Sequence, residues 1–453
     1  MSGRCKRRKS GKPTAQEPAP REIVSSEPAV QASRLARLPV ALGCLVFSWL
    51  PLQDNRRLTR CASFLRGIGR LPTASPVAVE WRTRGKGISG NAAKAVARVA
   101  HALRPIRLSL RTLGRDNIVP MDAVARIAGL RSLSIECNVL TGSDSLSTLT
   151  ALTDLTLRVD TADGLDLDAA RCTSLRRLHM LHMCPNRGLA SLATLTRLES
   201  LTLEVLAVGG GMWAPLAGLS RLSELGLLCA PGWPTIDLPV FPTDVSARLR
   251  RLALRGELSF AGSSLPTATL PHLRSLDLAR NAIHHLLFAR DMAQIERLVL
   301  SGTGVPLEHL SIDNLGRLDD LAKLRTLVLR NAAVRDLGGI EKLLALNELE
   351  LSGCAILASV AGVSGCKSLC TLGLHDCRQL VDIRPLDSVG QLTALSVRDC
   401  FLLHFPDELD ATVAVVNSLS GLGSLRLHEE FNVPALAPRL RRLAFGTDCC
   451  SLV

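Results

Sequence analysis

The sequence has very few aromatic residues. Phenylalanine, tryptophan and tyrosine together make up 3%, and tyrosine is absent. The hydrophobic content of 47% must therefore come mainly from aliphatic side chains. Proteins that bind single-stranded nucleic acid without sequence preference stack bases on aromatic side chains. The shortage of aromatics therefore argues against this class, and we expect no nucleic acid among the partners.

The chain also lacks a hydrophobic run long enough to cross a bilayer. The longest candidate, residues 38–52, has about 15 residues and is bounded by Pro39 and Pro51, whereas a spanning helix needs about 20. The last four residues, Cys450 to Val453, formally match a C-a-a-X box, so lipidation at Cys450 would make the chain a membrane-tethered binding protein. The alternative is a frayed terminus. We expect no membrane partner.

Motifs of enzymes and metal sites are missing as well. The sequence has no paired CxxC zinc spacing, nucleophile elbow, phosphate loop or metal-hydrolase motif. Of its histidines, His179 and His182 lie with Met183 in the segment LHMLHMC, which is a conceivable metal site, although chance variation on a repeat surface explains it as well. We therefore predict no enzymatic activity, no cofactor and no metal.

Positive charge is concentrated at the front of the chain. The net charge is +13, and residues 1–37 alone hold nine basic and three acidic residues. Residues 38–84 hold seven basic and two acidic residues. The first segment is charged and rich in Pro, Ser and Gly, which predicts a disordered tail. Its Lys6–Lys9 run is either a nuclear localisation signal or a solvated basic tail.

The 14 cysteines are spread along the chain rather than clustered. This distribution favours buried free thiols over disulfides, which is typical of a reducing compartment. We therefore expect a cytoplasmic protein, with the nucleus as the alternative that the basic tail leaves open.

What is present is a repeat. The lines LNELELSGCAI, LCTLGLHDCRQL and LTALSVRDCFLL share the pattern Leu-x-x-Leu-x-Leu/Val-x-x-Cys, and they begin at Leu346, Leu369 and Leu392, with a period of 23 residues. The pattern recurs with the leading residues Leu103, Leu130, Leu152, Leu175, Leu198, Leu222, Leu249, Leu273, Ile295, Leu324, Leu346, Leu369, Leu392, Leu422 and Leu440. Self-similarity at this period is the signature of a leucine-rich repeat.

The pattern predicts an α/β leucine-rich repeat solenoid. Alternating leucines indicate a strand in each repeat, and Cys354, Cys377 and Cys400 lie where the chain must leave it. A small, inward side chain is needed there to bond with backbone groups left unpaired in the bend. We expect a curved parallel sheet on the concave face, with short helices, 3-10 turns and loops on the convex face. The longer intervals after Leu222, Ile295 and Leu392 predict insertions.

The outward strand residues would line the concave face and form the target-binding surface. We assign this role to six residues: Arg251, Arg255, Arg297, Arg330, His375 and Arg398. The four arginines from Arg251 to Arg330 fall on neighbouring repeats and would form a basic stripe for an acidic or phosphorylated peptide. The alternative is an ordinary solvated sheet face.

Residues 37–81 resemble an F-box, a trihelical module of about 45 residues. The resemblance rests on Leu38-Pro39, Val46-Phe47-Ser48, Asp54 and Trp81, with further matches at Leu50, Leu52, Leu58, Cys61 and Phe64. Asn55 and Arg56 stand where the family has aliphatic residues. The resemblance implies a helical module over residues 38–84. The Gly-rich segment and the helix pattern that follow predict a linker and capping helix over residues 85–103, and the leucine pattern predicts the repeat domain over residues 104–453.

F-box proteins with leucine-rich repeats are substrate receptors of SCF-type cullin ubiquitin ligases. The resemblance implies that the module binds the acidic adaptor of the ligase, and that the repeats hold an unknown target protein for ubiquitin transfer. The adaptor-binding residues would be Leu38, Pro39, Phe47, Leu50, Leu52 and Leu58. The alternative is a leucine-rich repeat interaction scaffold with no ubiquitin role, in which this segment is a cap.

Overall fold

The computed structural model describes residues 44–48, 78–84, 106–113, 118–127, 129–159, 172–183, 192–205, 214–229, 236–237, 241–256, 258–259, 270–279, 292–302, 315–404, 406–427 and 436–445. The chain divides into two compact units, Met1–Gly43 and Cys44–Val453, and the described residues all belong to the second. The stretch 315–404 is described without a gap and holds the three most regular repeats.

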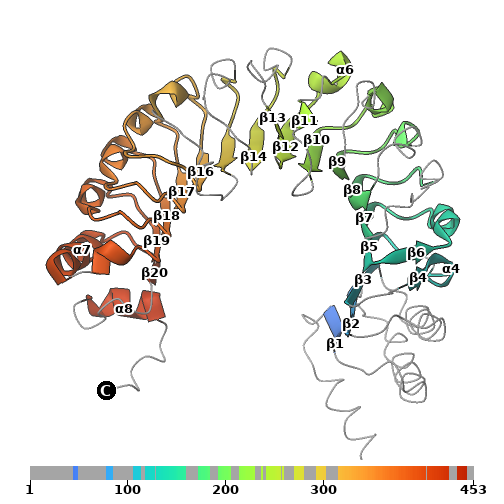
Figure 1. The fold of residues 1–453 in the computed structure, drawn as a ribbon, viewed down its shortest axis with the longest axis horizontal. Coiled ribbons are helices and arrows are strands. Elements are labelled where there is room, and N and C mark those ends of the chain that lie inside the picture. Colours follow the sequence, from blue (N-terminus) through green and yellow to red (C-terminus); the bar gives the residue numbers. More distant parts are fainter. Residues whose placement is uncertain are drawn as a thin grey trace, which may run out of the picture. The chain divides into compact units, whose positions relative to one another are not determined.

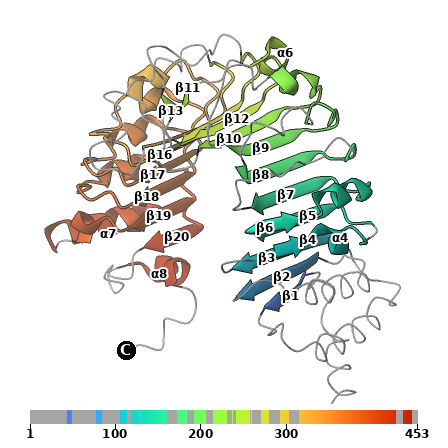
Figure 2. The same cartoon turned by 45° about the vertical axis from the view of Figure 1, so that its right-hand side comes forward.

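The main sheet has 16 strands, and each pairs in parallel with its neighbours in chain order (Figures 1 and 2). The strands are β1 (Cys44–Ser48), β2 (Ala78–Arg84), β3 (Arg107–Leu113), β5 (Ser132–Cys137), β7 (Asp154–Val159), β8 (Arg177–Met183), β9 (Ser200–Val205), β10 (Glu224–Cys229), β12 (Arg251–Arg255), β14 (Ser275–Ala279), β15 (Arg297–Ser301), β16 (Thr326–Arg330), β17 (Glu348–Ser352), β18 (Thr371–His375), β19 (Ala394–Arg398) and β20 (Ser424–Leu427). The repeats predicted from Leu103 to Leu422 each supply one of the strands from β3 to β20.

Leucine layers hold the strands together. Leu349 of β17 lies in register with Leu372 of β18, which lies in register with Leu395 of β19. Leu349 and Leu372 are 0% exposed and Leu395 is 2% exposed. Each repeat buries its leucines only against its neighbours, so stability rises from the contacts between successive repeats. The fold is a leucine-rich repeat solenoid.

Short elements return the chain from one strand to the next, and Figure 1 places them on the other side of each repeat from the strands. They are mostly 3-10 helices: η1 (Ser143–Thr148), η3 (Ala214–Gly218), η6 (Leu315–Leu318), η7 (Ile340–Lys342), η8 (Ala361–Gly365), η9 (Arg384–Ser388) and η10 (Phe401–His404). The connections also contain two short α-helices, α4 (Met121–Val124) and α6 (Thr243–Ser246). Two small pairs of parallel strands occur there as well: β4 (Ile118–Pro120) with β6 (Val139–Thr141), and β11 (Ile236–Asp237) with β13 (Leu258–Ser259). The prediction of 3-10 turns opposite the sheet is confirmed.

The long interval after Leu392 contains a full helix, α7 (Pro406–Ser418). Its Val413, Val415 and Val416 are buried, so the insertion packs onto the repeats. The predicted insertion is confirmed here, because the additional residues provide room for several helical turns that a 23-residue repeat lacks. No described helix is long and apolar enough to cross a membrane.

The cysteine ladder, defined as Cys354, Cys377 and Cys400, occupies the bend after each strand. All three side chains are 0% exposed. Each Sγ donates toward a carbonyl of the preceding repeat, at 3.9 Å from Leu329, 3.9 Å from Leu351 and 3.6 Å from Leu374, respectively. The predicted role of a small side chain that bonds to the backbone in the bend is confirmed. The described cysteines are free, which also agrees with the sequence prediction.

The residue before each ladder cysteine adopts a left-handed backbone conformation. Gly353, Asp376 and Asp399 have φ values of 66°, 49° and 55°. Glycine, aspartate and asparagine tolerate this region better than other residues do. The backbone N–H of Asp376 donates to the carbonyl of Arg398 on the next repeat at 2.9 Å, so this sharp turn also joins neighbouring repeats.

The structure differs from the sequence prediction at the start of the sheet. β1 and β2 are parallel strands within residues 38–84, where the F-box resemblance implies helices. A short apolar run cannot be assigned to helix or strand by its spacing alone, and residues such as Val46 and Phe47 suit a strand well. The backbone groups at the open edge of β3 give these segments a pairing partner, so the sheet begins ahead of residue 104.

The last predicted repeat is also different. Leu440 and Leu443 have the spacing of a repeat strand, but they lie in α8 (Pro438–Phe445). The spacing of these leucines fits one face of a helix equally well, and Pro438 suits the first helical turn. Leu440 is 2% exposed, and α8 packs on β20. The helix therefore covers the sheet beyond β20.

Candidate functional site

The candidate site is the open face of the sheet, defined as the strand face opposite the leucine core. In β17, Leu349 and Leu351 are buried, whereas Glu348, Glu350 and Ser352 alternate with them and are partly exposed. Parallel pairing without a register shift aligns such residues from strand to strand. Side chains that lie about 23 residues apart in the sequence therefore become neighbours on one continuous surface.

The six predicted target-binding residues lie on this face. Arg251 and Arg255 lie on β12, Arg297 on β15, Arg330 on β16, His375 on β18 and Arg398 on β19. Their predicted placement is confirmed, whereas their role in binding remains a prediction.

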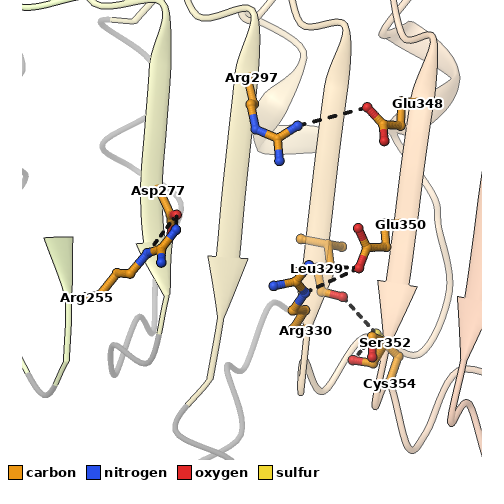
Figure 3. A network of polar contacts seen from close by, with 9 residues as sticks. All are labelled: Arg255, Asp277, Arg297, Leu329, Arg330, Glu348, Glu350, Ser352 and Cys354. Atoms are coloured by element: carbon orange, nitrogen blue, oxygen red, sulfur yellow. Dashed lines mark hydrogen bonds and ion pairs between the residues drawn. The ribbon is translucent and has the colours of Figure 1, made fainter. Parts of the chain in front are cut away.

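The predicted basic stripe is not an array of free cations. Arg251 lies 2.8 Å from a carboxylate oxygen of Glu224 on β10. Figure 3 shows the second pair, in which Arg330 lies 2.9 Å from Glu350 on β17. Each arginine thus has a carboxylate partner on an adjacent strand. The predicted stripe of positive charge is therefore wrong for this part of the face, because neighbouring repeats supply opposite charges.

The other two arginines of the predicted stripe are also paired. Nε of Arg255 donates to Asp277 on β14 at 2.9 Å. Arg297 reaches across β16 to Glu348 on β17 at 3.9 Å (Figure 3). These exposed pairs contribute little to stability individually, roughly 0–1 kcal/mol each. Their main effect is to make the middle of the open face a mixed, self-neutralised surface.

The same arrangement occurs nearer the N-terminal end of the open face, on strands for which the sequence predicts no binding residue. Glu136 on β5 lies 2.8 Å from Arg111 on β3 and 3.6 Å from Arg158 on β7. Arg177 on β8 pairs with Asp154 on β7. The available signal in the sequence was an acidic residue at the matching position of an adjacent repeat.

The C-terminal end of the open face differs in charge. Among the described residues, Arg398 on β19 and Arg426 on β20 form no ion pair, and His375 lies beside Arg398 in register. Burial lowers the pKa of His375, and Arg398 acts in the same direction, whereas Glu350 opposes them. At this end of the face, the available positive charge therefore comes from Arg398 and Arg426.

His179 does not form a metal site with other described residues. It lies on β8 between Thr156 and Thr202 in register. Its Nε2 is buried without a hydrogen-bond partner, and no group of three or more metal-ligating side chains occurs among the described residues. His182 and Met183 lie in β8, but their side chains are outside the described part.

We expect His179 to make stability depend on pH. Burial is the main factor that lowers its pKa below the ordinary value of 6.5, and Arg255 adds to it while Glu204 opposes it. The unfolded chain then binds a proton more readily than the folded chain, so the free energy of unfolding falls as pH falls below about 6.5. Urea unfolding between pH 7.5 and 5 should show a shallower pH dependence for His179→Gln.

The control for this prediction is Ser200→Ala, which changes a non-titrating residue on the neighbouring strand β9. It should leave the pH dependence unchanged. An equal pH dependence in the parent and in His179→Gln would contradict the prediction.

The predicted adaptor-binding residues are mostly beyond the described part. Leu38, Pro39, Leu50, Leu52 and Leu58 lie outside the described residues. Phe47 lies in the strand β1. The basic tail, the capping helix of residues 85–103 and Cys450 are outside them as well.

No protein-family model matches the chain. Solved structures with a similar fold include an internalin of Listeria monocytogenes, at 20% identity and a TM-score of 0.46, covering 74% of this chain and 94% of the other. A leucine-rich repeat protein of Leptospira interrogans matches at 17% identity and a TM-score of 0.48, covering 76% and 83%. A second Listeria monocytogenes internalin domain, described as including a cysteine ladder, matches at 16% identity and a TM-score of 0.38, covering 77% and 68%. The fold assignment rests on the strand register of this chain, because each TM-score is below 0.5.

Proposed function

We propose that the chain is a protein-binding scaffold whose open face holds a target protein. The observation that supports this most directly is the continuous parallel sheet, which presents aligned polar and charged side chains from many repeats. An extended surface of this kind suits a large partner better than a small substrate. In this proposal the chain binds and positions its partner and supplies no catalytic group.

The charge distribution indicates which end of the face attracts an acidic partner. Arginines in the middle of the face are already paired with Glu224, Asp277, Glu348 and Glu350. An acidic segment of a target would have to displace those partners, whereas Arg398 and Arg426 are available without such a cost. We therefore assign the contact with an acidic or phosphorylated target segment to the surface of β18–β20.

Reversal of these two charges tests the assignment. Arg398→Glu/Arg426→Glu should abolish recovery of the target when tagged full-length chain is purified from cell extract. Arg335→Glu/Lys367→Glu is the matched control, since both residues are exposed and lie outside the strands. Proteins retained by the parent and the control but lost from the first variant would support the assignment. Equal recovery with both variants would contradict it.

The substrate-receptor role implied by the F-box resemblance is the second candidate. It is supported by the Leu38-Pro39 and Val46-Phe47-Ser48 motifs, whereas the strands β1 and β2 weigh against a helical module. Leu38→Ala/Pro39→Ala separates the two functions. Adaptor and cullin that co-purify with the parent and disappear with this variant would support a ubiquitin-ligase role. Their absence, in an extract where other F-box proteins recover both, would leave the scaffold function.

The free, buried cysteines support a reducing compartment, so we place this function in the cytoplasm, with the nucleus as the alternative.

A further inference from the structure

A second surface with unusual charge lies where strands β10, β12 and β14 begin. The chain forms an open pocket of about 360 Å³ there, at the edge of the sheet rather than on its open face. The polar side chains that line it are Arg221, Ser223, Arg248, Arg250 and His272. Three consecutive repeats thus contribute basic side chains to one depression.

The repeat register explains why these residues converge. Glu224 and Arg251 are paired in the sheet, and Arg221 and Arg248 each lie three residues before them. These two arginines therefore occupy equivalent positions on adjacent repeats. Strands in a sheet lie about 4.8 Å apart, so the two side chains emerge next to each other. Arg250 precedes β12 directly and adds a third guanidinium group.

Arg248 is held in place but has an unused donor. One terminal nitrogen of its guanidinium donates to the carbonyl of Leu219 at 3.3 Å. Its Nε is buried and has no hydrogen-bond partner in the structure. Buried donors are nearly always satisfied, and a charged donor left alone is especially unfavourable. Arg248 also forms no ion pair among the described residues, so an anion in the pocket would supply a countercharge for its guanidinium group.

On the repeats that flank the pocket, arginines at the same edge of the sheet are paired with glutamates. Arg176 pairs with Glu199 at 2.9 Å, and Arg274 pairs with Glu296 at 3.5 Å. Within the described residues, Arg221, Arg248 and Arg250 have no such ion pair, and no acidic side chain lines the pocket. Three guanidinium groups without an ion pair among the described residues therefore come together at this pocket.

We propose that this pocket binds a phosphate group. Several guanidinium groups around one site suit a doubly charged ion with three or more oxygens better than a carboxylate, which accepts one bidentate arginine. A volume of about 360 Å³ also leaves room for part of the molecule that carries the phosphate. The phosphate belongs either to a phosphorylated protein segment or to a small phosphorylated molecule.

Calorimetric titration of the full-length chain at constant ionic strength tests the proposal. The probes are pyrophosphate, a phosphoserine peptide, its unphosphorylated form, and acetate. Arg221→Gln/Arg250→Gln removes two exposed charges and should weaken binding of the phosphate probes about tenfold or more. Arg248→Met should have a similar effect. Lys323→Gln/Arg325→Gln is the matched control, because these residues hold the positions of Arg248 and Arg250 in a repeat outside the pocket.

The outcomes separate the proposal from general charge attraction. Saturable binding of phosphate probes that is lost in the pocket variants and kept in the control supports it. A phosphopeptide that binds more tightly than pyrophosphate identifies a protein as the source, and the reverse order identifies a small molecule. Equal weakening by pocket and control variants, or equal binding of phosphorylated and unphosphorylated peptide, overturns the proposal, as does a lack of binding by the parent.

Discussion

Gly362→Ala should strongly destabilise the repeat domain. A Cβ atom at this position would lie 2.0 Å from the carbonyl oxygen of Leu337 and 2.9 Å from Cγ2 of Ile340. Gly362 lies in η8, which packs on η7 of the preceding repeat. The nearest obstacle is the backbone of Leu337, just ahead of η7, which cannot rotate away as a side chain can. Overpacking of this kind costs about 1–3 kcal/mol, and we expect a loss of about 3 kcal/mol because the repeats must separate.

Gly390→Ala is a control with the same chemical change. A Cβ atom on Gly390 would have no neighbour within 4 Å, and its backbone is not in the left-handed region. The free energy of unfolding should therefore change by less than about 0.5 kcal/mol. Urea unfolding of both variants, followed by circular dichroism, compares them directly. Similar free energies of unfolding for the two variants would contradict the close packing of Gly362 against the preceding repeat.

Cys370 should be alkylated much faster than Cys377 in the folded chain. Cys377 is completely buried. Its interaction with the neighbouring thiol of Cys354 raises its pKa to about 12, with burial acting in the same direction and Cys400 opposing them. A pKa about three units above the ordinary thiol value lowers the reactive thiolate fraction about a thousandfold near neutral pH. Cys370 is partly exposed. We therefore expect rapid alkylation of Cys370 and protection of Cys377 in the folded chain.

The measurement has an internal control, because both cysteines lie in one tryptic peptide, Ser368–Arg378. A short pulse of iodoacetamide at pH 8 should give a singly labelled peptide, with fragment ions that locate the label on Cys370. The same pulse in urea should give a doubly labelled peptide. Early double labelling in the folded state would contradict the buried ladder.

Most of the strand pattern is predictable from local sequence. The leucine spacing predicts the main-sheet strands from β3 to β20. Alternate leucines of each strand point into the core, where they pack against the equivalent leucines of the next repeat. The role of Cys354, Cys377 and Cys400 follows for the same reason. The sequence also indicates the left-handed turn before these cysteines, because glycine and aspartate at positions 353, 376 and 399 tolerate that conformation.

The two ends of the sheet were harder to predict. Leu440 and Leu443 fit a strand or a helix equally well by spacing, and packing on β20 selected the helix α8. Residues of β1 carry an ambiguous apolar pattern, and pairing with β2 selected the strand. A local pattern of a few residues cannot distinguish these outcomes, because the deciding contacts come from another segment.

The repeat, its buried leucine layers and the face to which each strand residue belongs can all be read from the sequence, because they depend on periodicity within a repeat. Which charged side chains are free of an ion pair depends instead on contacts between repeats in the folded chain. Arg330 and Glu350 are 20 residues apart, and Arg255 and Asp277 are 22 apart, yet each pair meets across the sheet. Arginines that form a basic stripe in the sequence are therefore neutralised on the open face, whereas Arg221, Arg248 and Arg250 converge at the edge. Strand register sets both results, because it determines which side chains of different repeats become neighbours.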